Sequence, residues 1–172
     1  MDDVRIGPEE PTPALAGEVL TLQRAAYVTE AQLYADAFLP PLLQTVEDIH
    51  AELAAGPSLM ARRGQRLVGS VRARQDGHLL RIGKLVVVPD LQGQGIGTRL
   101  LAGIEALAPE GVTCFSLFTG RLSAANLRLY RRAGYVETCA EELPGGATVV
   151  RLEKSVRAGD GTAPVPAPVP DC

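Results

Sequence analysis

Hydrophobic and polar positions follow two different periods along this chain, and each period is typical of one kind of secondary structure. Near the N-terminus, Leu15, Val19 and Leu22 recur at helical spacing and predict a helix with one apolar face. Thr45 and Asp48 form a capping-box pattern, in which each side chain can bond the backbone of the other, and they predict the start of a second helix. The first part of the chain is therefore expected to be mainly helical.

Residues 27–44, between these two helices, lose the helical period. Pro40 and Pro41 are adjacent there, and a proline inside a helix removes a backbone donor and clashes with the preceding turn. We therefore predict a loop or a broken helix over this stretch.

The middle of the chain changes to the spacing of strands. Apolar and β-branched positions predict strands over residues 59–62, 67–74 and 78–88, which turn signals at Gly64 and Gly77 separate. Because short turns connect these strands, we expect them to pair antiparallel.

The last third predicts a strand over residues 112–118, a helix over 123–133 and a closing hairpin over 134–152. A short first strand is expected at residues 4–6. This order predicts an α/β fold of the α+β type, with a central, mostly antiparallel mixed sheet flanked by about four helices.

A β-branched run, Leu85–Val88, leads into alternating glycines and then into a helix with an apolar face. The glycines are Gly93, Gly95 and Gly97. Glycine lets backbone N–H groups approach a ligand closely, and the free donors and dipole of a helix N-terminus favour negative charge. This stretch is therefore a candidate site for a phosphate or a pyrophosphate.

The glycine spacing excludes two common phosphate motifs. A dinucleotide fingerprint, G-x-G-x-x-G, needs its third glycine where Thr98 stands. A P-loop needs a lysine after its last glycine, and the sequence has no lysine between Lys84 and Lys154.

Residues Gln92–Gly97 instead resemble the Q/R-x-x-G-x-G/A loop of the GNAT family of N-acetyltransferases, which cradles the pyrophosphate of coenzyme A. Residues 121–135 resemble the second hallmark of that family, N-x-x-A-x-x-L-Y-x-x-x-G-F/Y. The positions that match it are Leu129, Tyr130, Gly134 and Tyr135. Ser123 and Asn126 stand where the family has asparagine and alanine. The resemblance covers roughly residues 57–154.

The resemblance implies acetyl-CoA, or another short acyl-CoA, as the donor, and a sheet that splays at the strand before the loop. Backbone groups of that strand would bind the pantetheine arm, at Leu85, Val86 and Val87. The pyrophosphate would lie on the loop formed by Gln92, Gly93, Gln94, Gly95, Ile96, Gly97 and Thr98. Asn126 is a further candidate for a hydrogen bond to the donor.

The resemblance also implies a catalytic role for Tyr130, which matches the tyrosine that protonates the departing thiolate. Without the motif, a helical tyrosine is more often a core aromatic. Tyr27 and Tyr34 are candidates for binding the acceptor. A covalent acyl-enzyme is not expected, because Cys114 lies in an apolar strand where a thiolate is unfavourable.

The catalytic base is the least defined part of the site. Amine attack needs proton removal, and the strand before the loop offers Arg81 and Lys84 but no carboxylate. We therefore select Glu30 as the candidate base, with Asp36 as the first alternative. The histidines, His50 and His78, stay open as further alternatives.

Composition narrows the partners and the compartment. The 172 residues carry a net charge of −3, which argues against nucleic acid as the main partner. No apolar run approaches the ~20 residues of a membrane span. The N-terminus does not resemble a signal peptide, and the cysteines lack metal-site spacing. We expect a cytoplasmic protein with no metal and no membrane partner.

The sequence thus predicts an acetyltransferase domain over residues 1–156 and a Pro/Ala-rich, disordered tail over 157–172. The main hypothesis is an acyl-CoA-dependent N-acyltransferase that moves acetyl directly to a primary amine of a small molecule. One alternative acceptor is the N-terminus or a lysine of a protein or peptide. Another alternative is a non-catalytic sensor that binds acyl-CoA. A homodimer also stays open, since dimers are common in the family.

Overall fold

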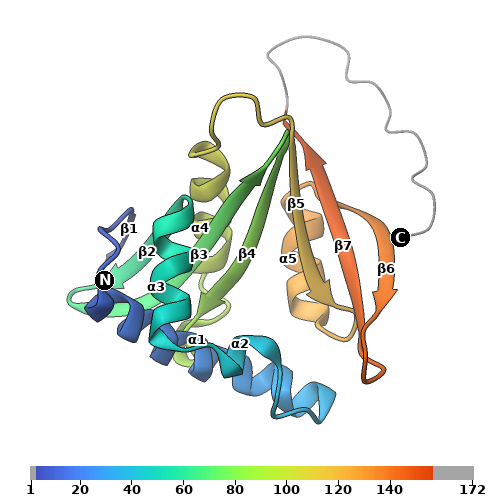
Figure 1. Cartoon of the computed structure of the whole chain (residues 1–172), viewed down its shortest axis with the longest axis horizontal. Helices are drawn as coiled ribbons and strands as arrows, with labels where there is room; N and C mark the ends of the chain where they lie inside the picture. The colour runs from blue at the N-terminus through green and yellow to red at the C-terminus, as the bar shows by residue number, and fades with distance from the viewer. Residues whose placement is uncertain (1–2, 157–172) are drawn as a thin grey trace. The chain divides into compact units, whose positions relative to one another are not determined.

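The computed structural model describes residues 3–156 of the chain (Figure 1). Its elements, in chain order, are β1 (Val4–Gly7), α1 (Pro13–Tyr34), α2 (Pro40–Leu43), α3 (Val46–Ala55), β2 (Ser58–Arg63), β3 (Arg66–Asp76), β4 (Leu79–Val87), the 3₁₀ turn η1 (Pro89–Leu91), α4 (Ile96–Ala106), β5 (Cys114–Gly120), α5 (Ala124–Arg132), β6 (Val136–Glu142) and β7 (Thr148–Ser155). This order confirms the predicted α/β class. The single turn α2 adds one helix to the number expected. Within the described residues, none of the helices is both long and apolar enough to span a membrane.

Hydrogen bonding joins the strands in the order β1-β2-β3-β4-β5-β7-β6. The pairs β1–β2, β2–β3, β5–β7 and β6–β7 are antiparallel, whereas β4 and β5 are parallel. The parallel pairing joins Leu79–Arg81 to Cys114–Ser116. The predicted mixed and mostly antiparallel sheet is therefore confirmed.

The described chain separates into two compact units. Unit 1 contains the residues up to Arg74 together with Ile82–Ala108, and unit 2 contains Gln75–Arg81 together with the chain from Pro109 onward. The boundary predicted after residue 156 stays a prediction. The predicted tail, residues 157–172, lies outside the described residues.

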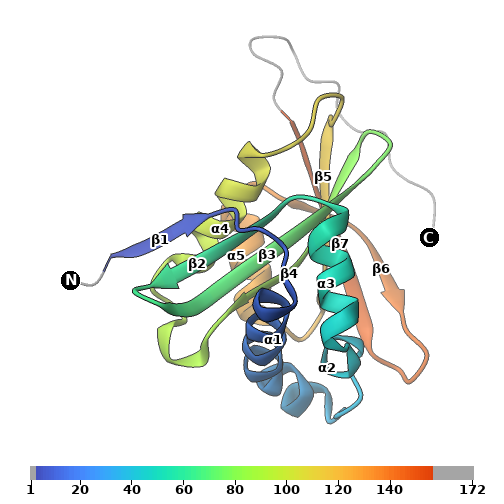
Figure 2. The ribbon, with the colours of Figure 1, turned by 60° about the vertical axis from the view of Figure 1, so that its left-hand side comes forward.

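Two helices of unit 1, α1 and α3, begin at side-chain caps. Thr12 accepts a hydrogen bond from the backbone N–H of Leu15 at 3.1 Å, at the start of α1. Thr45 and Asp48 form the predicted capping box at the start of α3. The two helices pack against each other through their apolar faces and cover one face of the strands of this unit, while α4 covers the other (Figures 1 and 2).

The prediction of a loop or broken helix over residues 27–44 is wrong for its first half. Helix α1 continues without a break to Tyr34 and ends at Ala35, which takes a left-handed conformation with φ of 50°. The stretch from 27 to 34 contains no proline, so nothing in it stops a helix that has already formed. Pro40 and Pro41 begin α2 rather than end a helix, because the first turn has no intrahelical donors to lose.

Close packing holds α4 against β2 and β3. A Cβ atom added to Gly69 would lie 2.9 Å from Cδ1 of Leu100, and one added to Gly103 would lie 2.8 Å from Cδ1 of Leu59. The helix therefore sits too near the strands for a side chain at either position. This packing fixes the start of α4, and with it the end of the glycine loop.

Unit 2 packs α5 against its strands. Tyr130 of α5 is buried and meets Tyr135 edge-on, with ring centroids 6.1 Å apart and an interplanar angle of 62°. On the sheet side, Phe115 and Leu117 of β5 are buried, as is Leu152 of β7. Tyr130 and Tyr135, two of the residues that match the second hallmark, therefore contact each other in the core of this unit.

Candidate active site

The glycine loop leaves an uncapped helix N-terminus in unit 1. Gly93 and Gly95 have φ of 76° and 81°, and Gly95 is the N-cap of α4. A Cβ atom on either glycine would meet nothing within 4 Å, so conformation rather than lack of room requires glycine here. No side chain in the described part of the chain caps the first amides of α4. These amides can therefore bind an anionic ligand.

The other loop residues hold the loop in place or face solvent. Ile96 is buried and anchors the start of α4, whereas Gln92, Gln94 and Thr98 are exposed. The side-chain amide of Gln92 donates to the carbonyl oxygen of Val87 at 3.1 Å and ties the loop to the end of β4.

Arg63, at the end of β2, is a residue of this site that the sequence did not reveal. Its Nη2 donates to Oε1 of Gln94 at 3.3 Å, so a guanidinium lies beside the loop. Its Nε is buried and has no hydrogen-bond partner among residues 3–156. A positive charge with unmet donors next to an uncapped helix N-terminus fits a pyrophosphate. The nearby Arg66 is already engaged, since both of its terminal nitrogens lie 2.8 Å from the Asp90 carboxylate.

The predicted pantetheine-binding residues, Leu85, Val86 and Val87, form the end of β4. Val86 is buried and its two neighbours are partly exposed. Lys84, directly before them, has φ of 52°, which is uncommon for any residue except glycine. Such backbone strain is concentrated at functional sites. Burial also lowers the pKa of Lys84.

The unbroken α1 brings together residues that the sequence assigned to the acceptor side. Tyr27, Glu30 and Tyr34 are spaced three and four apart on one helix, so they share a face. Burial raises the pKa of Tyr27 to about 12, and the charge of Glu30 adds to that shift. The structure therefore couples the candidate base to a candidate acceptor-binding tyrosine.

The alternative bases have other contacts. Asp36 accepts a hydrogen bond from the backbone N–H of Phe38 at 2.8 Å, as expected for a turn residue. Nε2 of His50 lies 3.2 Å from the carbonyl oxygen of Pro11. His78 is exposed in the turn before β4.

A polar network with two buried members, Gln23 and Arg72, was also not predicted from the sequence. Arg72 of β3 is only 4% exposed, and its Nη2 donates to Oε1 of Gln23 at 2.7 Å. Gln23 donates to Oε1 of Gln44 at 2.8 Å, and Gln44 donates to Oε1 of Glu52 at 2.6 Å. The second carboxylate oxygen of Glu52 lies 2.9 Å from Nε of Arg72. The four side chains form a closed ring that joins α1, α3 and β3.

In unit 2, Asn126 and Tyr130 lie on α5. The amide of Asn126 donates to the hydroxyl of Thr119 at 3.3 Å. Tyr130 is buried against Tyr135, so it contributes to the core whatever else it does. Burial raises the pKa of the Cys114 thiol, which makes a nucleophilic thiolate unfavourable.

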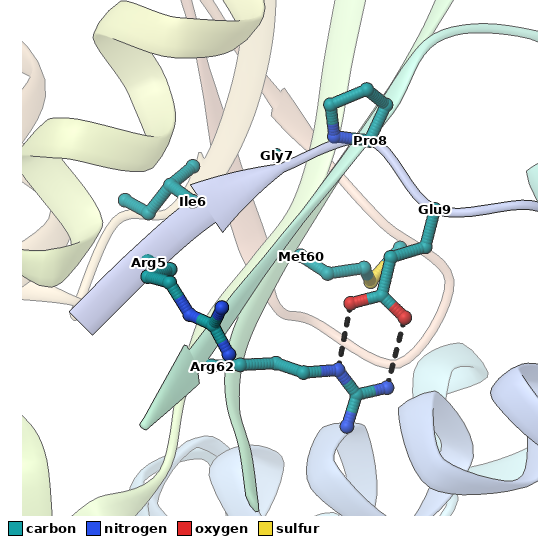
Figure 3. Close-up of a pocket in the computed structure, with 7 residues that line it drawn as sticks. All are labelled: Arg5, Ile6, Gly7, Pro8, Glu9, Met60 and Arg62. Carbon is teal, nitrogen blue, oxygen red and sulfur yellow. Dashed lines mark hydrogen bonds and ion pairs between the residues drawn. The ribbon is translucent and has the colours of Figure 1, made fainter. Parts of the chain in front are cut away.

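A pocket of about 220 Å³ lies in unit 1 beside β1 (Figure 3). Arg62 on its wall binds Glu9 at 2.7 Å and Glu18 at 2.9 Å, and these bonds raise the pKa of its guanidinium. The pocket contains none of the predicted site residues, and the charge of Arg62 on its wall is paired. We therefore assign it a structural role. Across residues 3–156, no three His, Cys, Asp or Glu side chains gather as a metal site would require.

Known proteins identify the class to which this fold and loop belong. The model of the Acetyltransferase (GNAT) family matches residues 26–135, which is more than half of the chain. The chain therefore belongs to the GNAT acetyltransferase family, and the predicted resemblance is confirmed.

Two curated proteins are similar to parts of the chain. UPF0157 protein YqkA of Bacillus subtilis strain 168 is 31% identical over 123 residues, which cover 70% of this chain and 34% of that protein. Mycothiol acetyltransferase of Cellulomonas flavigena is 32% identical over 99 residues, which cover 51% of this chain and 28% of that protein. The chain thus spans about a third of the length of these curated relatives.

A solved structure shows the same fold. The paia N-acetyltransferase of Thermoplasma acidophilum, in complex with coenzyme A, superposes with a TM-score of 0.70. The match covers 90% of this chain and 99% of that chain at 15% sequence identity. The predicted fold is therefore confirmed.

Proposed function

We propose that this chain is an acyl-CoA-dependent N-acyltransferase that transfers acetyl from acetyl-CoA directly to a primary amine of a small molecule. The observation that carries the proposal is the glycine loop, with its uncapped α4 N-terminus and the guanidinium of Arg63 beside it, in a chain of the GNAT family. Amide donors, a helix dipole and a free positive charge together suit the pyrophosphate of coenzyme A.

The proposed chemistry needs no covalent intermediate on the protein. The amine nitrogen attacks the thioester carbonyl carbon, the carbon–sulfur bond breaks, and the departing sulfur takes a proton from the phenol of Tyr130. Backbone groups of Leu85–Val87 hold the acyl arm, and the amide near Val87 stabilises the developing oxyanion. Most of the rate enhancement comes from holding the amine against a polarised thioester.

Proton removal from the amine is assigned to Glu30, acting directly or through water. Its place on the face of α1 that carries Tyr27 and Tyr34 supports this role, because these tyrosines are the proposed acceptor-binding residues. A carboxylate on the same helix face as two tyrosines gives the acceptor both a binding surface and a base.

Replacing Tyr130 by Phe tests the proposal. The variant keeps the ring and its packing, so we expect normal folding and normal acetyl-CoA affinity but a kcat at least about 10-fold lower in a thiol-release assay with a panel of amines. Tyr135→Phe is the matched control, since it removes a hydroxyl from the other ring of the same aromatic pair. Equal activity of the two variants would contradict the role of Tyr130, and absence of turnover in the wild-type chain would favour the sensor.

A further inference from the structure

The ring of Arg72, Gln23, Gln44 and Glu52 leaves part of the buried arginine without a partner. Nη1 of Arg72 is buried and has no hydrogen-bond partner within residues 3–156. Its Nε is also without a well-aligned hydrogen bond, although it pairs in charge with Glu52 at 2.9 Å. A buried charged donor that lacks a partner is strongly unfavourable, so native proteins rarely keep one without a use for it.

A second unmet group lies on the same side of β3. The hydroxyl oxygen of Ser70 is buried and has no partner in the described chain. Ser70 and Arg72 are two positions apart on a strand, so their side chains point to one face of the sheet. Arg72 bonds Gln23 of α1 and pairs with Glu52 of α3, which identifies this face as the one that these helices cover. A single polar spot under α1 and α3 therefore holds both unmet groups.

Lys84 and Tyr27 supply further donors at this spot. Lys84 is partly buried in β4, and the charges of both Arg72 and Glu52 act on it, so it lies near the ring. The charge of Arg72 acts on both Lys84 and Tyr27. Two cationic side chains and a phenol thus converge here.

Glu52 and Glu30 are the acidic groups that act on this spot, and Glu52 already has other partners. Glu52 already accepts from Gln44 and pairs with Arg72, and it is 42% exposed. Glu30, one turn along α1 from Tyr27, is the proposed base. The unmet donors of Arg72 are therefore left for an acceptor group that comes with a ligand.

We infer that the acceptor amine carries a carboxylate, and that Arg72 binds this carboxylate through Nη1 and so determines acceptor specificity. The inference rests on the proposed function, because it gives the substrate class of the same site. The planar guanidinium matches a carboxylate better than any other side chain does. Lys84 directly precedes the strand residues assigned to the acyl arm, so a carboxylate held here leaves the amine of the same small molecule near the thioester.

Matched acceptors test the inference with the wild-type chain. The assay measures thiol release from acetyl-CoA with α-amino acids, each paired with its α-carboxamide, and with straight-chain ω-amino acids, each paired with the alkylamine of equal length. We expect at least one carboxylate acceptor to exceed its uncharged partner in kcat/KM by about 10–100-fold, because a charge-assisted hydrogen bond has that effect. Equal activity within every pair would overturn the inference.

The variant Arg72→Lys separates recognition from structure. It keeps the positive charge but loses the planar guanidinium with its several donors. KM for the preferred carboxylate acceptor should therefore rise by about 10-fold or more, with little change in kcat. Arg74→Lys, an exposed change on the same strand, is the control and should leave KM unchanged. An equal loss with carboxylate and uncharged acceptors would show that Arg72 only supports the fold, with water on Nη1.

A separate measurement of acetyl-CoA binding distinguishes failure of this inference from failure of the proposed function. If Arg72→Lys fails to fold, the comparison of matched acceptors with the wild-type chain still decides whether the acceptor must carry a carboxylate. A chain that binds acetyl-CoA and acetylates only uncharged amines overturns the inference and leaves the proposed function standing. A chain that binds no acyl-CoA overturns both.

Discussion

Arg63 and Gln94 meet beside the glycine loop, where Nη2 of Arg63 donates to Oε1 of Gln94 across 3.3 Å. The two residues come from the end of β2 and from the loop before α4, so tertiary packing alone brings them together. Arg66, close to Arg63 in sequence, instead binds Asp90 with both terminal nitrogens and lowers the pKa of that carboxyl group. One arginine is therefore free to serve a ligand while the other is neutralised.

This difference predicts unequal effects of two similar substitutions. Arg63→Gln should weaken acetyl-CoA binding by about 10-fold, because it removes a charge-assisted contact to the pyrophosphate. Arg66→Gln should change the affinity little, since its charge is already paired at the surface. Calorimetric titration at fixed salt measures both. Equal losses would mean that the arginines act only through general surface charge.

The left-handed conformation of Gly95 predicts a second pair of effects. Gly95→Ala should destabilise the fold by about 1–2 kcal/mol and weaken acetyl-CoA binding, because an L-residue at φ of 81° is strained. Gly17→Ala, inside α1 where a Cβ atom meets nothing within 4 Å, should stabilise by about 0.5–1 kcal/mol. Urea unfolding gives both values. A neutral Gly95→Ala would rule out the proposed role of this backbone conformation.

The raised pKa of Tyr27 predicts a dependence of stability on pH. The folded chain keeps the phenolic proton up to about pH 12, whereas an unfolded tyrosine releases it near ~10. This contribution is therefore complete below about pH 10 and is lost as the pH rises through the folded pKa. The stability of Tyr27→Phe relative to wild type should rise by about 1 kcal/mol between about pH 9 and 11. A constant difference across that range would show that Tyr27 is not desolvated in the fold.

Much of the fold, including the glycine loop and the start of α4, follows from local sequence. The caps at Thr45 and Asp48 and the glycine loop use contacts between residues a few positions apart, which sequence spacing shows directly. The sequence does not predict the extension of α1 to Tyr34, because the apolar helical period is lost after residue 26. Pro40 and Pro41 act only on the turn before them, so residues 27–34 can stay helical.

The positions of Arg63 and Arg72 could not be predicted from the sequence. Each makes its contacts across different elements, and a strand pattern does not tell which arginine will be buried. In the sequence, Arg72 has the place of an exposed polar residue in an alternating strand. In the structure, β3 is buried on both faces over residues 67–73, and Arg72 is buried with it. A buried arginine in such a strand becomes informative only when its partners are known.

The assignment of Glu30 predicts a loss of turnover without a loss of donor binding. Glu30→Gln should lower kcat by about 100-fold or more at neutral pH, because the amine then loses its general base. Asp36→Asn tests the alternative base, and Glu47→Gln, on the exposed first turn of α3, is a control for loss of surface charge. A larger effect of Asp36→Asn than of Glu30→Gln would contradict the assignment.

Binding of the donor tests the central claim most directly. The measurement is calorimetric titration of the full chain with acetyl-CoA, with NADH and ATP as controls at equal concentration. We predict saturable binding of acetyl-CoA at one site per chain and no comparable binding of either control. Absence of binding by acetyl-CoA and by longer acyl-CoAs would contradict the account, and the glycine loop would then be only a turn between β4 and α4.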